Sequence, residues 1–321
     1  MRRLRAAPVA VLLLFAVLAA CSGAPDRPAE DAASRPAGQT AGTATGPSSG
    51  PATASPSGPS KGATTGPPGG ATNHPTGRPP TGPASRPTPT RWQPRPGVAW
   101  QWQLDGKVDP SVDVPVYDID GFENSAAAVA RLHRDGRKVI CYINVGAWED
   151  FRPDRDAFPR SVLGGPNGWH GERWLDIRRI PVLRPLMERR FDMCRDKGFD
   201  AVEPDLMEGY ANDTGFPLTA DDQLRYNRMI AEIAHERGLA VGLKNDLAQI
   251  PRLVRHFDFA VNEECAEFDE CALLAPFVAA GKAVFHVEYS EPTAGFCPEA
   301  RALRLSSMLK NPELDVWRRP C

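Results

Sequence analysis

From Val98 to its C-terminus, the sequence lacks the motifs of several large classes of enzyme. It has no Gly-x-Ser-x-Gly elbow, which an α/β-type Ser-His-Asp hydrolase requires, and no His-Glu-x-x-His pair for a metal hydrolase. No glycine-rich loop follows the first expected strand, so no nucleotide site is predicted. No run of Lys and Arg with interleaved aromatic residues is present, which argues against nucleic-acid binding. We therefore expect no cofactor, no metal ion and no nucleic-acid partner.

The seven cysteines also lack the pattern of a zinc site, because they form no Cys-x-x-Cys pair and no Cys/His cluster. Six remain when Cys21, part of the N-terminal signal, is set aside. An even number of cysteines in an exported domain favours disulfides, with zinc binding as the alternative. Spacing alone does not fix the connectivity. The six fit three pairs, among other possibilities: Cys141 with Cys194, Cys265 with Cys271, and Cys297 with Cys321.

The N-terminus is typical of a bacterial lipoprotein signal. Three arginines precede an apolar run from Val9 to Leu18, which is too short to span a bilayer as a stable helix. Small residues and Cys21 follow. We predict a signal peptide over residues 1–20 and lipidation of Cys21, which would anchor the exported chain to the outer face of the bacterial cell membrane. The alternative is an ordinary secretory signal in which Cys21 is incidental.

Residues 21–97 have the composition of a disordered linker. Seventeen of the 33 prolines of the chain lie between residues 22 and 97, among Gly, Ser, Thr and Ala. Such a segment has too little apolar surface to offset the entropy lost on ordering. It predicts a semi-extended tether, so that the membrane is contacted through the lipid anchor only.

Residues 98–321 are long enough for one domain with a substantial core. They carry 28 Lys and Arg against 37 Asp and Glu, so their net charge is −9. An acidic domain disfavours anionic polymers and suits a cationic substrate. We expect this domain to be a monomer.

Within this domain, short apolar runs alternate with longer amphipathic ones, which predicts an α/β fold with a (β/α)8 TIM-barrel as its single catalytic domain. An open doubly wound sheet is the alternative. The connection after the first strand looks too short for a helix. The expected strands are 98–104, 114–119, 138–144, 201–205, 239–245, 257–263, 283–289 and 314–317. The expected helices are 125–135, 183–197, 219–237, 250–256, 271–280 and 299–310.

Acids and amides collect at the ends of the expected strands, where a (β/α)8 barrel has its active site. Carboxylates from different strands, with Trp and Tyr near them, are typical of a sugar-cleaving cleft. One acid protonates the leaving oxygen, and the other attacks the sugar or activates water. Each residue taken alone is compatible with a solvated strand end, so the clustering carries the prediction. The clustered residues are Asp118, Asp120, Asn144, Glu203, Asp205, Lys244, Asn245, Asp246, Glu263, Glu264, His286 and Glu288.

Eight motifs, in order along 98–321, resemble glycoside hydrolase family 114. They are Trp-Gln-Trp-Gln-Leu (100–104), Val-Tyr-Asp-Ile-Asp (116–120), Val-Ile-Cys-Tyr (139–142), Trp-Leu-Asp-Ile-Arg (174–178), Gly-Phe-Asp-Ala-Val-Glu-Pro-Asp (198–205), Gly-Leu-Lys-Asn-Asp (242–246), Asn-Glu-Glu-Cys (262–265) and Val-Phe-His-Val-Glu-Tyr (284–289). The resemblance implies a (β/α)8 barrel with endo-α-1,4-polygalactosaminidase activity on galactosamine polymers. It also implies that Asp205 is the nucleophile and Glu263 the acid/base of a two-carboxylate, retaining mechanism.

Other strand-end residues are expected to bind the substrate, because free galactosamine units are cationic. Lys244 is also expected to keep a neighbouring carboxylate ionised. Leu206 departs from the family pattern, in which Asn follows Glu-Pro-Asp. Two alternatives stay open: a surface carbohydrate-binding lipoprotein without turnover, and a glycosidase of another amino-sugar polymer. The expected substrate-binding residues are Asp118, Asp120, Tyr142, Glu203, Lys244, Asp246 and Glu288.

Overall fold

The computed structural model describes residues 91–321. The predicted signal peptide, Cys21 and the linker as far as residue 90 lie outside this range. Residues 91–97 of the predicted linker lie against the domain: the amide of Ala283 donates to the carbonyl of Pro94 at 2.9 Å, and the ring of Trp92 lies 6.3 Å from that of Phe259. The packed domain therefore begins before Val98.

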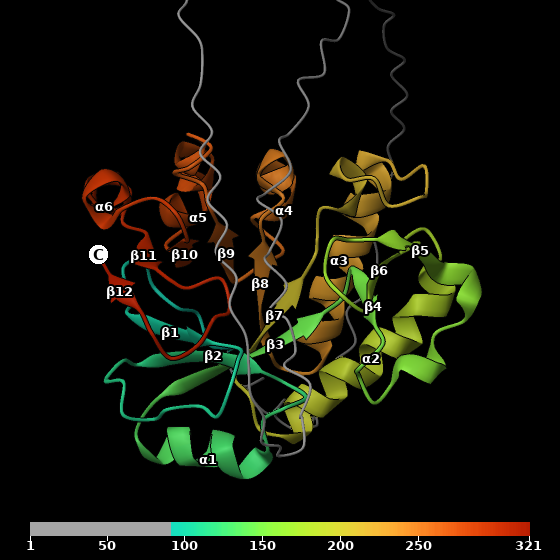
Figure 1. The fold of residues 1–321 in the computed structure, drawn as a ribbon, viewed down its shortest axis with the longest axis horizontal. Coiled ribbons are helices and arrows are strands. Elements are labelled where there is room, and N and C mark those ends of the chain that lie inside the picture. Colours follow the sequence, from blue (N-terminus) through green and yellow to red (C-terminus); the bar gives the residue numbers. More distant parts are fainter. Residues whose placement is uncertain (1–90) are drawn as a thin grey trace, which may run out of the picture. The chain divides into compact units, whose positions relative to one another are not determined.

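The domain is built on one curled sheet with the strand order β1-β2-β3-β7-β8-β9-β10-β11-β12 (Figure 1). The pairs from β1 to β11 are all parallel, and β12 pairs antiparallel with β11. The indole of Trp100 on the first strand donates to the carbonyl of Ser306 on the eighth at 2.8 Å, which joins the two ends of the parallel set. The strands are β1 (Trp100–Gln103), β2 (Val116–Asp120), β3 (Lys138–Asn144), β7 (Ala201–Asp205), β8 (Ala240–Lys244), β9 (Phe259–Glu263), β10 (Val284–Glu288), β11 (Ser306–Leu309) and β12 (Arg319–Pro320).

Helices connect most of these strands and complete the predicted (β/α)8 barrel. Within residues 91–321, no helix separates β1 from β2, as the short connection predicted. The clearest predicted helix, α3, begins at a capping box in which Thr219 and Asp222 exchange hydrogen bonds. The helices are α1 (Ala126–Arg134), α2 (Ile180–Asp196), α3 (Ala220–Glu236), α4 (Ile250–Leu253), α5 (Ala275–Ala279) and α6 (Thr293–Ala302).

The C-terminal part of the barrel differs from the prediction. The expected helix 299–310 and strand 314–317 are wrong: α6 ends at Ala302, and the eighth parallel strand is β11 (Ser306–Leu309). Arg304 between them has a φ of 59°, the left-handed conformation that ends many helices. The eighth strand therefore begins eight residues earlier than expected.

The segment between β3 and α2, in which no strand or helix was expected, contains a small antiparallel sheet of order β4-β6-β5. Its strands are β4 (Ala147–Glu149), β5 (Leu163–Pro166) and β6 (Glu172–Leu175). Buried arginines fasten the segment to the barrel: Arg152 forms two hydrogen bonds with Asp120, at 2.7 and 3.1 Å, and Arg190 of α2 bonds Asp154 and the carbonyl of Asn144. This sheet forms part of the wall above the barrel end.

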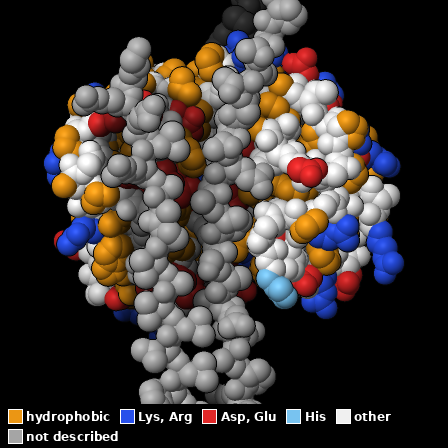
Figure 2. Space-filling view, turned by 45° about the horizontal axis from the view of Figure 1, so that its top comes forward, with side chains coloured by type: hydrophobic (Ala, Val, Ile, Leu, Met, Phe, Trp, Pro, Cys, Tyr) orange, Lys and Arg blue, Asp and Glu red, His pale blue; other side chains and the backbone are white. Residues whose placement is uncertain are grey.

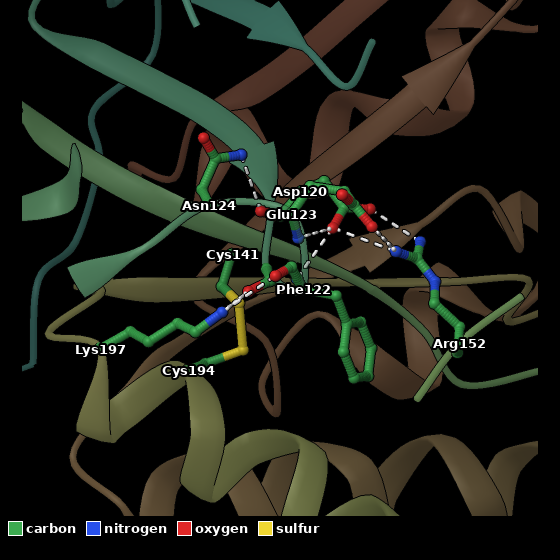
Figure 3. The surroundings of a disulfide bond; sticks show 9 residues. Asp120, Phe122, Glu123, Asn124, Cys141, Arg152, Cys194 and Lys197 are labelled. Carbon is green, nitrogen blue, oxygen red and sulfur yellow. Dashed lines mark hydrogen bonds and ion pairs between the residues drawn. A yellow bond between two sulfur atoms is a disulfide. The ribbon is translucent and has the colours of Figure 1, made fainter. Parts of the chain in front are cut away.

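The three predicted cysteine pairs are present as disulfides. Cys141–Cys194 joins β3 to α2, beside Lys197, whose ammonium group donates to the carbonyls of Gly121 and Phe122 (Figure 3). Cys265–Cys271 closes a short loop after β9, and Cys297–Cys321 ties the C-terminal residue to α6. In residues 91–321 no helix has the length and apolar character needed to cross a membrane.

Candidate active site

A large acidic cleft opens at the carboxyl ends of the barrel strands. Its volume is about 1170 Å³, above the roughly 300–1,000 Å³ of a typical small-molecule pocket. Thirteen of the residues that line it are Asp or Glu, and one, Arg152, is basic. Figure 2 shows Lys and Arg side chains mainly towards the edges of the view and acidic side chains both nearer its middle and at its edges. A cleft of this size and charge suits several units of a cationic polymer.

The predicted catalytic pair lies at the floor of this cleft. Asp205 ends β7 and Glu263 ends β9, and Lys244 ends β8 between them. The Nζ atom of Lys244 lies 3.0 Å from Asp205 Oδ1 and 3.1 Å from Glu263 Oε2. One cation therefore holds both carboxylates, and both line the cleft.

Each of the two carboxylates also accepts a hydrogen bond from a tyrosine. Tyr142 on β3 donates to Asp205 Oδ2 at 2.7 Å. Tyr289, directly after β10, donates to Glu263 Oε1. Burial and then the Asp205 carboxylate raise the pKa of Tyr142 well above its usual range, so this hydroxyl keeps its proton. The carboxylates are thus fixed from two sides, which pre-organises them for chemistry.

A second layer of charge lies beneath the cleft floor, where Asp118, Glu203 and Lys244 are fully buried. Lys244 Nζ lies 3.0 Å from Glu203 Oε1, and the Lys244 ammonium sits 4.7 Å from the ring centre of Trp102. Burial and the neighbouring Glu203 raise the pKa of Asp118 well above its usual range. The neutral form of Asp118 is therefore favoured beside Glu203, and the carboxylates that Lys244 Nζ contacts directly are those of Glu203, Asp205 and Glu263.

The predicted substrate-binding residues divide into three groups. Asp120, Tyr142 and Asp246 line the cleft, although Asp120 is already held by Arg152. Asp118, Glu203 and Lys244 are buried under the floor, where they touch the catalytic carboxylates or each other rather than the cleft. Their placement favours support of the catalytic pair over contact with the substrate.

The third group is Glu288 alone, which does not line the cleft. Phe285 and Val287 of β10 pack inside the barrel, so His286 and Glu288, on the opposite face of the same strand, point away from it. Glu288 is fully buried and accepts hydrogen bonds from His286 at 2.7 Å and from the amide of Ala266 at 2.8 Å. It supports the loop after β9.

Sequence reasoning missed two half-buried acids of the cleft, Glu208 and Glu172. Burial raises the pKa of Glu208 to about 8 and that of Glu172 to about 7. Glu208 follows Asp205 by three residues in the loop after β7, and this proximity was the available signal. Glu172 lies on β6 of the small sheet, a segment in which no strand was expected, and accepts a hydrogen bond from Asn167 at 2.7 Å.

A metal site is not supported among the described residues. Cys265, Cys271 and His286 have ligand atoms within 4.8 Å of one another. The two cysteines are joined in a disulfide, which leaves no thiolate to bind a metal, and His286 Nε2 is paired with Glu288.

Three neighbouring strands end at non-glycine residues in the left-handed conformation. Leu206 after β7 has a φ of 59°, Asn245 and Asp246 after β8 have 48° and 49°, and Glu264 after β9 has 64°. These sharp turns leave Asp205, Asp246 and Glu263 at the mouth of the barrel. Asn adopts this conformation at lower cost than Leu, so the family's usual Asn at the position of Leu206 has a physical reason.

We expect Leu206→Asn to stabilise the domain by about 1 kcal/mol, because it relieves the left-handed strain of a leucine. The matched control is Leu206→Ala, which shortens the side chain and keeps the strain. Thermal unfolding should place the Asn variant above the Ala variant by roughly 2–4 °C for a domain of this size. Equal melting temperatures for these two variants would show that the turn is not strained.

A barrel whose strand ends hold two carboxylates on one lysine, at the floor of a polymer-sized cleft, is the architecture of a glycoside hydrolase. The chain matches the model of glycoside-hydrolase family GH114 over residues 82–321, and it belongs to this family. It is therefore a glycoside hydrolase.

Solved structures agree with this assignment. The chain is similar to Aspergillus fumigatus Ega3, whose crystal structure is a complex with galactosamine, at 40% identity and a TM-score of 0.69; the match covers 72% of this chain and 98% of Ega3. It also resembles the glycoside hydrolase domain of PelA from Pseudomonas aeruginosa in fold, at 14% identity and a TM-score of 0.54, over 69% of this chain and 97% of that domain. The comparison with curated proteins found no match.

Proposed function

We propose that this protein is an endo-acting hydrolase of α-1,4-linked galactosamine polymers. The observation that carries the proposal is the pair Asp205 and Glu263, held by Lys244 on the floor of an acidic cleft. The similarity to Ega3, which was crystallised with galactosamine, supports the choice of sugar. The excess of acids along the cleft supports a substrate with free amino groups, and the cleft volume supports cleavage within a chain.

The spacing of the two carboxylates supports a retaining mechanism. Asp205 Oδ1 and Glu263 Oε2 lie 3.0 and 3.1 Å from the same nitrogen, so these oxygens are at most about 6 Å apart. Retaining glycosidases place the two groups about 5–5.5 Å apart, and inverting ones roughly 6.5–9.5 Å. Asp205 would attack the anomeric carbon while Glu263 protonates the leaving oxygen. Glu263 would then take a proton from the water that releases the sugar from Asp205.

The test is product analysis with a de-N-acetylated α-1,4-galactosamine polymer. We expect new reducing ends and fragments of intermediate length, and proton NMR of the first products should show the α-anomer. A fully N-acetylated polymer is the comparison substrate and should be cleaved much more slowly. First products of β configuration would exclude retention. Binding of the polymer without new reducing ends would favour a surface carbohydrate-binding protein without turnover. Faster cleavage of another amino-sugar polymer would favour a glycosidase of that polymer.

We further propose that the enzyme works at the outer face of the cell membrane, attached through Cys21 and the proline-rich tether. The proposal rests on the N-terminal sequence pattern. We expect the Cys21→Ser variant to leave the membrane fraction, whereas the unmodified chain stays in it. Equal distribution of the two would exclude the lipid anchor.

A further inference from the structure

Two acids that the catalytic steps do not use lie side by side in the cleft. Glu208 follows β7 and Asp246 follows β8, and both line the cleft. The amide of Asp246 donates to Glu208 Oε2 at 3.2 Å, which brings the carboxyl group of Glu208 to the base of Asp246. Asp246 is held in a left-handed backbone conformation, with a φ of 49°, of the kind that concentrates at functional sites.

Buried side chains of α3 fix Asp246 in place. Asn227 donates to Asp246 Oδ2 at 2.9 Å and to the carbonyl of Met207 at 3.0 Å. Gln223 donates to Asn227 at 2.8 Å, and both amides are fully buried. This network satisfies one oxygen of Asp246 and orients the whole carboxyl group.

The other oxygen of Asp246, Oδ1, makes no hydrogen bond, although the Tyr210 hydroxyl lies near enough to this carboxyl group to oppose the rise in the pKa of Asp246. Asp246 is only 4% exposed, yet its Oδ1 atom is buried without a donor. A buried polar atom left in this state costs free energy unless a ligand satisfies it. Since Asp246 lines the cleft, the missing hydrogen-bond partner would come from a bound molecule.

We propose that Glu208 and Asp246 form the subsite that recognises the ammonium group of an amino sugar and so set the preference for free amine over N-acetyl. This inference deepens the proposed function and rests on it. An ammonium group carries three donors and a positive charge, which the open oxygen of Asp246 and the adjacent Glu208 carboxyl group match. An acetamide group offers one donor and no charge, so it leaves the pair unsatisfied.

The electrostatics of the pair add a measurable consequence. Burial, followed by neighbouring acids, raises the pKa of Glu208 to about 8 and that of Asp246 to about 9. Both groups are therefore protonated near neutral pH when the site is empty. A bound ammonium group favours the ionised form, so one carboxyl group should lose its proton to solvent as the amine binds. The groups that face the pair are Asp205, Tyr210, Asn227, Lys244, Asn245 and Glu263.

The first experiment measures this proton in the intact chain. Galactosamine, which has no glycosidic bond to cleave, is titrated at about pH 6 in two buffers of different ionisation enthalpy, and galactose is titrated in parallel. We expect close to one proton released per galactosamine bound, and none with galactose. Binding of galactosamine with no proton release would overturn the proposal.

The second experiment uses isosteric variants, Glu208→Gln and Asp246→Asn, singly and together. The double variant should bind galactosamine at least about tenfold more weakly, as expected for loss of a charged hydrogen bond, and should release no proton. Glu313→Gln is the control variant, because it removes an exposed acid at the cleft rim. It should weaken galactosamine binding only slightly, and added salt should abolish this small difference from the parent.

The outcomes separate this subsite from the proposed function. If the parent chain cleaves the galactosamine polymer but the double variant binds galactosamine equally well, the subsite assignment fails and the activity stands. If the parent neither binds galactosamine nor cleaves its polymer, both fail. Circular dichroism and melting temperature of each variant show whether a loss of binding comes from unfolding. The number of protons released per galactosamine bound is measured on the parent chain, so this test holds even if the variants fail to fold.

Discussion

Asp205→Asn should reduce kcat on the galactosamine polymer by at least about 10⁴-fold, because the amide cannot form the glycosyl-enzyme bond. Glu263→Gln should reduce it by about 10²–10⁴-fold, the usual range for a lost general acid. Both substitutions keep the shape of the side chain. Both variants should therefore still bind the polymer, and initial-rate measurements of new reducing ends would record the losses.

A substrate with an activated leaving group separates the two roles. An α-galactosaminide of dinitrophenol needs no protonation to depart, so Glu263→Gln should form the glycosyl-enzyme intermediate at nearly the parent rate and then stall. Added azide should restore turnover of this variant, because it attacks the intermediate without a general base. Asp205→Asn should stay inactive with this substrate. Full recovery of Asp205→Asn, or no recovery of Glu263→Gln, would reverse or exclude the assigned roles.

The order of strands and helices was predictable wherever glycine marks the end of a helix. The expected helices that precede β3, β7, β8 and β10 stop at Gly136, Gly198, Gly238 and Gly281, all with positive φ. At the C-terminus the same left-handed position is taken by Arg304. Arginine gives no stop signal, so the helical pattern was continued through the strand β11 and displaced the eighth strand.

The position of the proposed catalytic pair was predictable because period-two alternation and strand order place Asp205 and Glu263 at one end of the barrel. How deeply each inward-facing side chain lies below the cleft floor was not predictable in this way. Asp118 and Glu203 share the inward face with Asp120 and Asp205, one pleat lower, and burial makes them a support for Lys244. Their distance from the cleft depends on how far each strand is shifted relative to its neighbours, which a single sequence does not reveal.

When both faces of a strand are buried, the sequence pattern also does not show which side chains point into the barrel. Every residue of β10 is buried, so its pattern does not tell which face meets the barrel interior. The sequence therefore did not reveal that Glu288 is buried away from the cleft. The proximity of Glu208 to Asp246 was also not predictable from the sequence. It results from the turns after β7 and β8, which contain left-handed residues, and from a hydrogen bond that α3 donates to Asp246, so three separate segments are involved.

Lys244 is the residue whose replacement should affect both activity and folding most. Lys244→Met keeps an unbranched side chain of nearly the same length but leaves Glu203, Asp205 and Glu263 without the cation that they share. Breaking a buried ion pair by removing one partner costs about 3–5 kcal/mol of unfolding free energy. The free energy of unfolding from denaturant titration would measure this loss near neutral pH.

The loss of stability in Lys244→Met should depend on pH. Burial already raises the pKa of Glu203, and Lys244 opposes that rise. Without the lysine, the folded pKa lies further above the unfolded value, so the variant loses stability as the pH rises from about 4 towards the higher folded pKa. The difference from the parent should therefore shrink below about pH 4.

Activity should follow the same electrostatics. A carboxylate that has lost its cation holds its proton to higher pH, so the acidic limb of the pH dependence of kcat/KM should move to higher pH in Lys244→Met. Lys310→Met is the matched control, since Lys310 is also buried but donates to the carbonyls of Asp315 and Trp317, away from the catalytic pair. This control should lose stability and keep the acidic limb in place. An unmoved limb in Lys244→Met would mean that the lysine holds the carboxylates in position without keeping the nucleophile ionised.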